Sequence, residues 1–230
     1  MVSKKTLFVS CDLSLEIEEI FDFLGYGCVR LPKCDALDAP VASHPDMLFF
    51  KLPSGELLGD REYCEKNSEL LLKTGGRFLL SQKRLDKKYP KDVLFDAFAI
   101  RNTLYARIDA VAPEILAAYN KAVNVRQGYA KCSTLIAGEV AVTADTGIYK
   151  ALTENGVKTL LISPETVRLT GYGCGFIGGA SFFDADTSTV VLFGEPDKND
   201  PVVPFLKKNG INTLYPNSYP LTDFGGAIQI

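Results

Sequence analysis

The sequence predicts an α/β fold, a five-bladed α/β-propeller built from five strand-strand-helix-strand units in a closed ring. Three observations lead to this prediction. A helical stretch followed by a β-rich run occurs five times in 230 residues, pairs of apolar strands precede four of these helices, and the C-terminus can supply the strand that the first unit lacks. At about 46 residues a unit, the period lies in the range of propellers and repeat arrays.

Each unit contains a helical stretch that runs into residues typical of a strand. These stretches are residues 15–32, 67–82, 112–128, 147–163 and 202–218. In four of them a glycine stands at the junction, where a helix C-cap favours a left-handed residue. These glycines are Gly27, Gly76, Gly156 and Gly210. The third stretch has Ala122 and Val123 at this place, which makes it the weakest match.

Pairs of apolar strands precede the later helices, and an acid follows the second strand of each pair. The pairs are residues 47–52 with 56–63, 93–100 with 103–109, 133–139 with 140–145, and 175–183 with 189–194. With the corresponding residue of the first unit, the acids are Asp12, Asp60, Asp109, Asp145 and Glu195. The aspartates suit helix N-caps, and all five suit the positive end of a helix. Asp145 has Thr143 and Thr146 beside it, so it is also a candidate ligand residue.

The chain ends in an apolar segment, LTDFGGAIQI. Chain ends fray unless something holds them, so an apolar end predicts incorporation into a sheet. If residues 225–230 pair with residues 6–11, the first unit gains its missing strand and the ring closes. Closure also removes exposed sheet edges. We therefore expect residues 1–230 to form a single domain.

Composition excludes several classes of function. A net charge of −3 gives no electrostatic reason to expect a nucleic acid or an anionic membrane as partner. The N-terminus lacks the long apolar run of a signal peptide, and no stretch is long enough to span a membrane, so we expect a cytoplasmic protein. The six cysteines are scattered without a CxxC pair, and only one histidine is present. This pattern predicts reduced thiols, no metal and no organic cofactor.

The repeat architecture resembles the pentein, or guanidino-modifying-enzyme, superfamily. This superfamily includes arginine and agmatine deiminases, dimethylarginine hydrolases, amidinotransferases and a non-enzymatic ribosome anti-association factor. Locally, HPDMLF, YAKCSTLI and YGCGFIGGASFFD resemble an uncharacterised bacterial subgroup with this fold. The resemblance implies a cysteine that attacks a guanidinium carbon, a histidine that moves protons, and carboxylates that hold the guanidinium group.

The usual nucleophile of the superfamily is missing from this chain. In its relatives it lies near the C-terminus, in a segment that resembles Gly-Gly-Gly-Ile-His-Cys. That segment falls on residues 225–230, where the glycines and Ile228 match but Ile230 stands at the cysteine position. Any small shift of the alignment leads to the same conclusion, because no cysteine follows Cys174.

Other candidate catalytic side chains stand at the starts of the first strands. His44, the usual type of proton shuttle, lies two residues from Asp46, although Pro45 and a local Asp46 side-chain bond would equally suit a simple turn. Cys132 and Cys174 precede the first strands of successive units. Either could be reactive or a buried structural thiol, and Lys131 would lower the pKa of Cys132 if their side chains converged.

A channel mouth ringed by side chains from all units follows from this pattern. Its predicted members are Asp46, Asp92, Cys132, Cys174 and Asp223. The glycine-rich run around Cys174 indicates either a loop that faces a ligand or tight packing. The hypothetical catalytic residues are Cys174, His44 and Asp46. The candidate ligand-binding residues are Asp46, Lys131, Cys132, Asp145, Gly175, Phe176, Gly178, Gly179 and Asp223.

Three functions fit the sequence. The first is a binding protein with a polar central pocket for a small polar or cationic ligand, without the usual catalysis. The second is a cysteine-dependent hydrolase of a guanidino or amidino compound, with Cys174 or Cys132 as a relocated nucleophile. The third is a non-enzymatic scaffold. The sequence leaves the ligand and the oligomeric state open.

Overall fold

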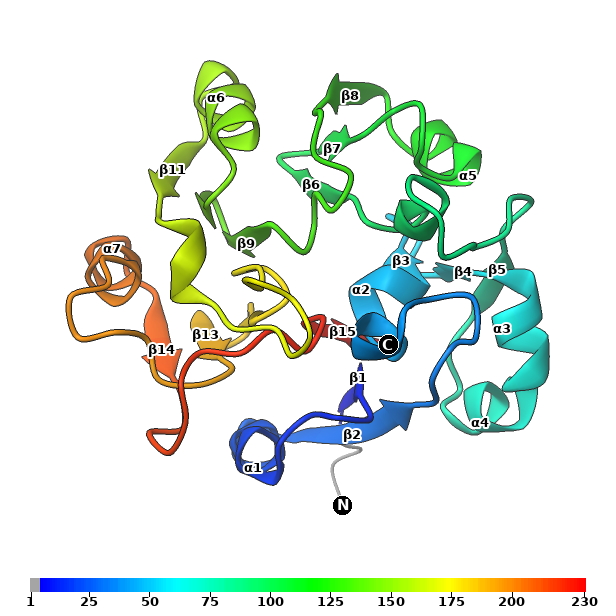
Figure 1. The fold of residues 1–230 in the computed structure, drawn as a ribbon, viewed down its shortest axis with the longest axis horizontal. Coiled ribbons are helices and arrows are strands. Elements are labelled where there is room, and N and C mark those ends of the chain that lie inside the picture. Colours follow the sequence, from blue (N-terminus) through cyan, green and yellow to red (C-terminus); the bar gives the residue numbers. More distant parts are fainter. Residues whose placement is uncertain (1–4) are drawn as a thin grey trace.

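The computed structural model describes residues 5–230 as five three-stranded sheets that follow one another around the middle of the molecule (Figure 1). The sheets contain, in spatial order, β15 (Ala227–Gln229), β1 (Lys5–Ser10) and β2 (Tyr26–Leu31); β3 (Phe49–Lys51), β4 (Leu57–Gly59) and β5 (Phe78–Leu80); β6 (Phe98–Ile100), β7 (Thr103–Ala106) and β8 (Lys121–Asn124); β9 (Thr134–Ala137), β10 (Val140–Thr143) and β11 (Lys158–Leu161); β12 (Ser181–Asp184), β13 (Thr189–Leu192) and β14 (Asn212–Leu214).

Every sheet has the same plan. Its first two strands are antiparallel and its last two are parallel, and a helical segment connects the parallel pair. The connecting helices are α1 (Leu15–Phe23), α3 (Arg61–Lys66) with α4 (Ser68–Lys73), α5 (Pro113–Ala117), α6 (Thr146–Glu154) and α7 (Val202–Lys208). This plan confirms the predicted order of elements within each unit.

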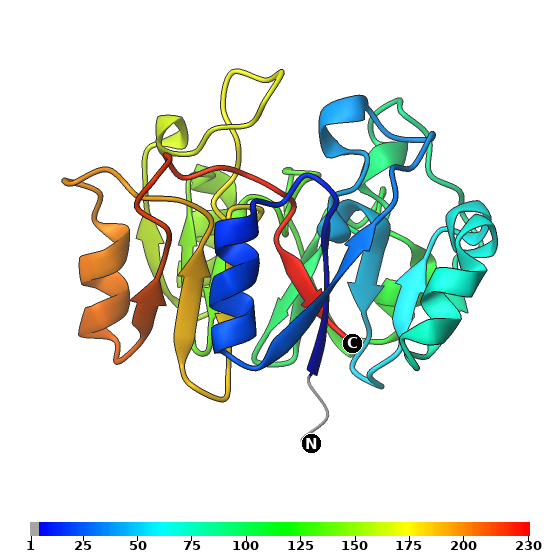
Figure 2. The same cartoon turned by 90° about the horizontal axis from the view of Figure 1, so that it is seen from below.

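The C-terminal strand closes the first unit, as predicted. β15 pairs antiparallel with β1, and Phe8 lies opposite Ile228. Figure 2 shows the two strands side by side, with the described parts of both chain ends close together. The backbone N–H of Ile230 also donates to the carbonyl of Thr6, at 3.0 Å. The apolar tail is therefore held by a sheet.

The first strands of the units begin later than predicted. Pro45–Leu48 forms the short helix α2, Lys91–Val93 forms the 3-10 turn η2, and β12 begins only at Ser181. The two remaining short turns are η1 (Ala39–Val41) and η3 (Pro164–Thr166). Buried apolar runs fit a helical turn and a strand equally well, and Pro45 favours the first helical position. These turns carry the polar side chains of the site.

Two of the four predicted C-cap glycines are correct. Gly156 and Gly210 have φ of +74° and +75°. At the other two helices the left-handed residues are Gly25 and Gly75. Gly27, assigned to the first cap, lies inside β2, and Gly76 directly follows Gly75. Where two glycines stand close together, the pattern alone cannot select the one that leaves the helix.

The predicted N-caps are correct at two helices. Asp60 accepts from the backbone N–H of Tyr63, and Asp145 accepts from that of Ile148. The other N-cap positions are occupied by Ser14, Ala112 and Pro201. The remaining predicted acids, Asp12, Asp109 and Glu195, are therefore not N-caps. Asp109 instead pairs with the guanidinium group of Arg107, at 3.0 Å.

Apolar side chains fill the space between neighbouring sheets. The ring of Phe8 on β1 packs against Phe49 on β3, with ring centroids 5.3 Å apart, and Phe78 lies next to both. Within this apolar interior several carboxylates are also buried, among them Asp46, Asp96 and Asp223. Buried carboxylates require partners, which makes their surroundings the place to look for a site. Within residues 5–230 no helix is long and apolar enough to cross a membrane.

Candidate functional site

A cavity of about 310 Å³ lies where the first strands of the units begin, and we call it the upper cavity. The turns that precede these strands bring its side chains together from all five units. It is lined by Leu37, Asp38, Val41, His44, Met47, Lys87, Asp92, Tyr129, Cys132, Leu169, Tyr172, Gly173, Cys174, Phe176 and Asp223. Its volume is in the range of small-molecule pockets.

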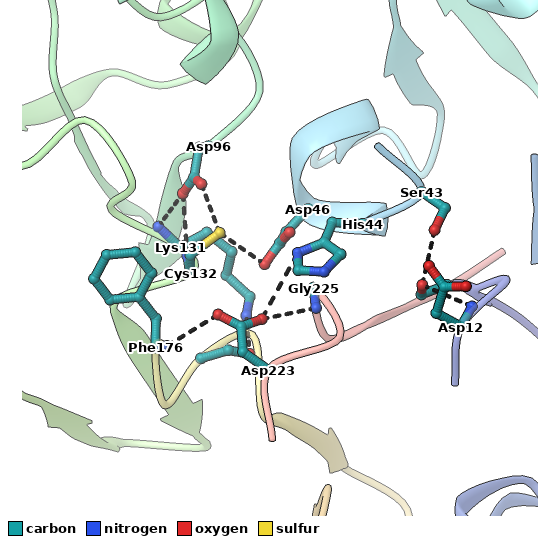
Figure 3. Close-up of polar contacts among 12 residues, drawn as sticks. Asp12, Ser43, His44, Asp46, Asp96, Lys131, Cys132, Phe176, Asp223 and Gly225 are labelled. Atoms are coloured by element: carbon teal, nitrogen blue, oxygen red, sulfur yellow. Dashed lines mark hydrogen bonds and ion pairs between the residues drawn. The ribbon is translucent and has the colours of Figure 1, made fainter. Parts of the chain in front are cut away.

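Six side chains meet beneath the upper cavity, and we call them the central cluster (Figure 3). They are His44, Asp46, Asp96, Lys131, Cys132 and Asp223. All except the half-buried Lys131 are at most 3% exposed. Each comes from a turn before a first strand, so the repeated architecture explains why the side chains converge.

Asp96 holds Cys132 in place. Its Oδ1 accepts the backbone N–H groups of Lys131 and Cys132, at 2.5 and 3.1 Å. Its Oδ2 accepts the Cys132 thiol, at 2.8 Å. One carboxylate therefore fixes both the backbone turn and the side chain of the cysteine.

Asp46 is less well satisfied than Asp96. Its Oδ2 lies 3.1 Å from the Cys132 sulfur, but a thiol has one proton, and Asp96 is the nearer acceptor. The Oδ1 of Asp46 is buried without a hydrogen-bond partner among the described residues. Burial, reinforced by the charge of Asp96, raises the pKa of Asp46 well above its usual value. Asp46 thus has a buried oxygen with unused hydrogen-bonding capacity.

The cluster keeps Cys132 in its thiol form. Burial raises the pKa of Cys132 well above its usual value, and the carboxylates Asp46, Asp96 and Asp223 raise it further. The pKa of Cys132 is therefore raised even with Lys131 as its neighbour in the chain, because burial and three acids prevail over one ammonium group. Burial also raises the pKa of Asp96 to about 7, against the hydrogen bonds that it accepts.

Asp223 joins the C-terminal segment to the cavity wall. It accepts the backbone N–H groups of Phe176 and Gly225, both at 2.9 Å. The Nδ1 of His44 lies 3.7 Å from Asp223 Oδ1. Burial lowers the pKa of His44 despite this carboxylate, so the imidazole is neutral at pH 7.

Glycines are required around Asp223. A Cβ atom at Gly179 would lie 2.1 Å from Asp223 Oδ1, and one at Gly178 would lie 2.1 Å from the carbonyl of Lys131. Gly225 has φ of +76°, and its Cβ would lie 2.3 Å from that of His44. Close packing therefore accounts for these glycines without a ligand.

The structure brings most predicted site residues together. His44, Asp92, Cys132, Cys174, Phe176 and Asp223 line the upper cavity, while Asp46 and Lys131 lie behind it in the central cluster. The backbone of Gly175 packs against Arg168 and Asp223. Asp145 lies apart, as the N-cap of α6. Their roles in binding or catalysis remain predictions.

The sequence-based prediction missed Asp96 and Tyr129. Asp96 stands in the run VLFDAFAI, which was assigned wholly to a strand, and a single acid in an apolar run was the available signal. Tyr129 stacks on Phe176, with ring centroids 5.9 Å apart, and donates to Asp92 at 2.5 Å. Within the described part of the chain, no group of three His, Cys, Asp or Glu side chains is arranged to hold a metal ion.

The model of a family of unknown function, DUF6873, matches residues 8–228. A comparison with curated protein sequences gives no match.

Solved structures of dimethylarginine dimethylaminohydrolase are similar to the chain. One, an adduct with 4-chloro-2-hydroxymethylpyridine, has a TM-score of 0.56 at 10% identity and covers 94% of this chain and 93% of its own. A histidine-to-glycine variant with S-methyl-L-thiocitrulline gives 0.52 at 9% identity, with the same coverage of 94% and 93%. A cysteine-to-serine variant of the Pseudomonas aeruginosa protein with citrulline gives 0.55 at 10% identity and covers 99% of both chains. The likeness confirms the pentein fold, and at this identity it shows the fold alone.

Proposed function

Since the chain belongs to DUF6873, a family of unknown function, and has the pentein fold, we propose that its upper cavity binds a small organic cation or an amide-bearing molecule without the usual pentein catalysis. In this proposal residues 1–230 are one domain, and the five sheets are the blades of a propeller that β1 and β15 close. The central cluster then plugs the middle of the ring with polar side chains.

The acidic lining of the upper cavity carries the proposal. Three carboxylates and one lysine line it: Asp38, Asp92, Asp223 and Lys87. Asp92 Oδ1 is buried without a hydrogen-bond partner among residues 5–230. Guanidinium and amidinium groups present several N–H donors in one plane and suit such carboxylates. The stacked rings of Tyr129 and Phe176 offer aromatic faces that favour a cation.

Cys132 is poorly suited to the usual catalysis. A thiolate is the attacking form of cysteine, whereas the Cys132 thiol donates to Asp96 and has a strongly raised pKa. In addition, Ile230 stands where the resemblance places the superfamily nucleophile. These features favour binding over hydrolysis.

One observation supports the hydrolase as a second candidate. Cys174 and His44 line the same cavity, and Cys174 is more accessible than Cys132. A thiol and an imidazole facing one bound substrate could act as nucleophile and proton shuttle. Ammonia or urea release from a panel of guanidino and amidino compounds tests this candidate. Turnover that Cys174→Ala abolishes would establish it, and turnover unchanged in that variant would exclude Cys174 as nucleophile.

Ligand-induced stabilisation tests the binding proposal. We expect at least one guanidinium or amidinium compound to raise the melting temperature in a concentration-dependent way, because a ligand that binds only the folded state stabilises it. Asp92→Asn should weaken this ligand about tenfold by removing one charged hydrogen-bond acceptor. Asp186→Asn, at an exposed carboxylate away from the cavity lining, is the matched control. A panel without any stabilising compound would contradict the proposal.

A further inference from the structure

A second cavity, of about 320 Å³, lies along the first strands, and we call it the lower cavity. Its walls come from β3, β6, β9 and β15 and from Tyr119. It shares no lining residue with the upper cavity, and the central cluster contributes different members to each. The proposed function makes no use of it.

An acid and a lysine of the central cluster line the lower cavity. Asp46 carries the buried Oδ1 that has no partner among the described residues. Lys131 Nζ donates to the carbonyl of Gly178, at 3.2 Å, and an ammonium group has three donors. Both residues adjoin the turn at Gly225 and Gly226, which places them at the same end of the cavity.

The remaining walls are mainly apolar. They present Phe50, Phe98, Tyr119, Ile136 and Ile228. At the exposed side, Lys51 Nζ donates to the carbonyl of Gln229, at 2.9 Å. One end of the lower cavity therefore presents an acid and an ammonium group, and the rest of its lining is mainly apolar.

We propose that the lower cavity binds an α-amino acid with an apolar side chain. The ammonium group of the ligand pairs with Asp46, its carboxylate pairs with Lys131, and its side chain lies against the aromatic and branched walls. A zwitterion gives a partner both to the unpartnered oxygen of Asp46 and to the remaining donors of Lys131, whereas a ligand with only one of the two groups makes only one of these contacts.

Proton linkage should make ligand affinity at this site depend on pH. Burial raises the pKa of Asp46, so the ammonium group of the ligand has to displace its proton. The acids Asp96 and Asp223, the Cys132 thiol and Lys131 influence the charge of the same carboxyl group, and His44 lies beside Asp223. Affinity should consequently rise with pH until Asp46 is ionised in the free protein.

Calorimetric titration of the full chain tests the proposal. The probes are L-phenylalanine, 2-phenylethylamine, which lacks the carboxylate, and 3-phenylpropanoate, which lacks the ammonium group. We expect phenylalanine to bind at least about tenfold more tightly than either analogue, since each analogue loses a charged hydrogen bond. Equal affinities of the three probes, or no phenylalanine binding at millimolar concentration, would overturn the proposal.

A variant that fills the lower cavity, compared with a surface variant, tests where the ligand binds. Ala99→Leu on β6 places a larger side chain at the cavity wall, whereas Ala122→Leu makes the same change on the exposed face of β8. We expect Ala99→Leu to abolish phenylalanine binding while its melting temperature stays close to that of Ala122→Leu, which should bind as the unmodified chain does. Undiminished binding by folded Ala99→Leu would place the ligand elsewhere. Since Ala99 lies outside the upper cavity, this result is independent of the proposed function.

Discussion

Cys132 and Cys174 line the same cavity from successive units, yet their surroundings differ. Both precede a first strand and line the upper cavity. Cys132 is 3% exposed, donates to Asp96 and lies beside Asp46, whereas Cys174 is partly exposed in a glycine-rich loop. Two thiols at one cavity therefore differ, because the residues that surround each of them decide what it can do.

Thiol alkylation should show the largest difference between the two sites. With iodoacetamide at pH 8, followed by peptide mass spectrometry, we expect Cys174 to react about a thousandfold faster than Cys132. A thiol as buried as Cys132 reacts only when the fold opens, at a free-energy cost of several kcal/mol. In concentrated urea the two rates should become similar. Equal rates in the native protein would contradict the difference in burial.

Removal of the Asp96 carboxylate should destabilise the turn that holds Cys132. Asp96→Ala leaves two backbone N–H groups and a thiol without their acceptor, so we expect a loss of about 3 kcal/mol in the free energy of unfolding. Asp96→Asn keeps an oxygen for the backbone and should lose less. Urea denaturation measures both variants. Equal losses would mean that the backbone bonds contribute little.

A methyl group at Gly179 should destabilise the fold around Asp223. The Cβ atom of Gly179→Ala would collide with Asp223, and overpacking of this kind costs about 2 kcal/mol. Gly173→Ala is the control in the same loop, because its Cβ would have no atom within 4 Å. The two melting temperatures are compared. A neutral Gly179→Ala would show that Asp223 moves freely.

The buried acids should make the free energy of unfolding depend on pH. The pKa of Asp96 is raised to about 7, so the folded state holds more protons than the unfolded state between about pH 4 and pH 7. Since one pKa unit corresponds to about 1.4 kcal/mol, stability should fall by roughly 4 kcal/mol over this interval as pH rises. The lowered pKa of His44 has the opposite effect. Below the usual histidine pKa the unfolded state holds more protons at this residue, so its contribution makes stability rise with pH. Urea denaturation at several pH values should give a flatter profile for Asp96→Asn, and an identical slope would contradict the assignment.

Local patterns were sufficient to predict much of the architecture. Alternating helices and strands, with caps such as Gly156 and Asp60, predict the five units because each signal depends on a few adjacent residues. The apolar tail predicts its own pairing with β1. The starts of β3 and β6 could not be predicted, because a buried apolar run has the same composition in a turn and in a strand.

The candidate site was predicted only in part. His44, Cys132, Cys174 and Asp223 could be grouped because they hold comparable positions in the repeat. Asp96 was missed because its role depends on Cys132, 36 residues further along the chain. The lower cavity left no pattern in the sequence, since its charged end and its apolar walls come from separate units.

The sequence by itself determined the order of the elements, the closure by the C-terminal strand and the absence of any cysteine beyond Cys174. Only the tertiary structure decided that Cys132 meets Asp46, 86 residues away, and Asp96, and that the pKa of Cys132 is raised. The physical reason is that strand and helix signals are local, whereas protonation and hydrogen bonding in a buried cluster depend on burial and on charges that distant segments bring together.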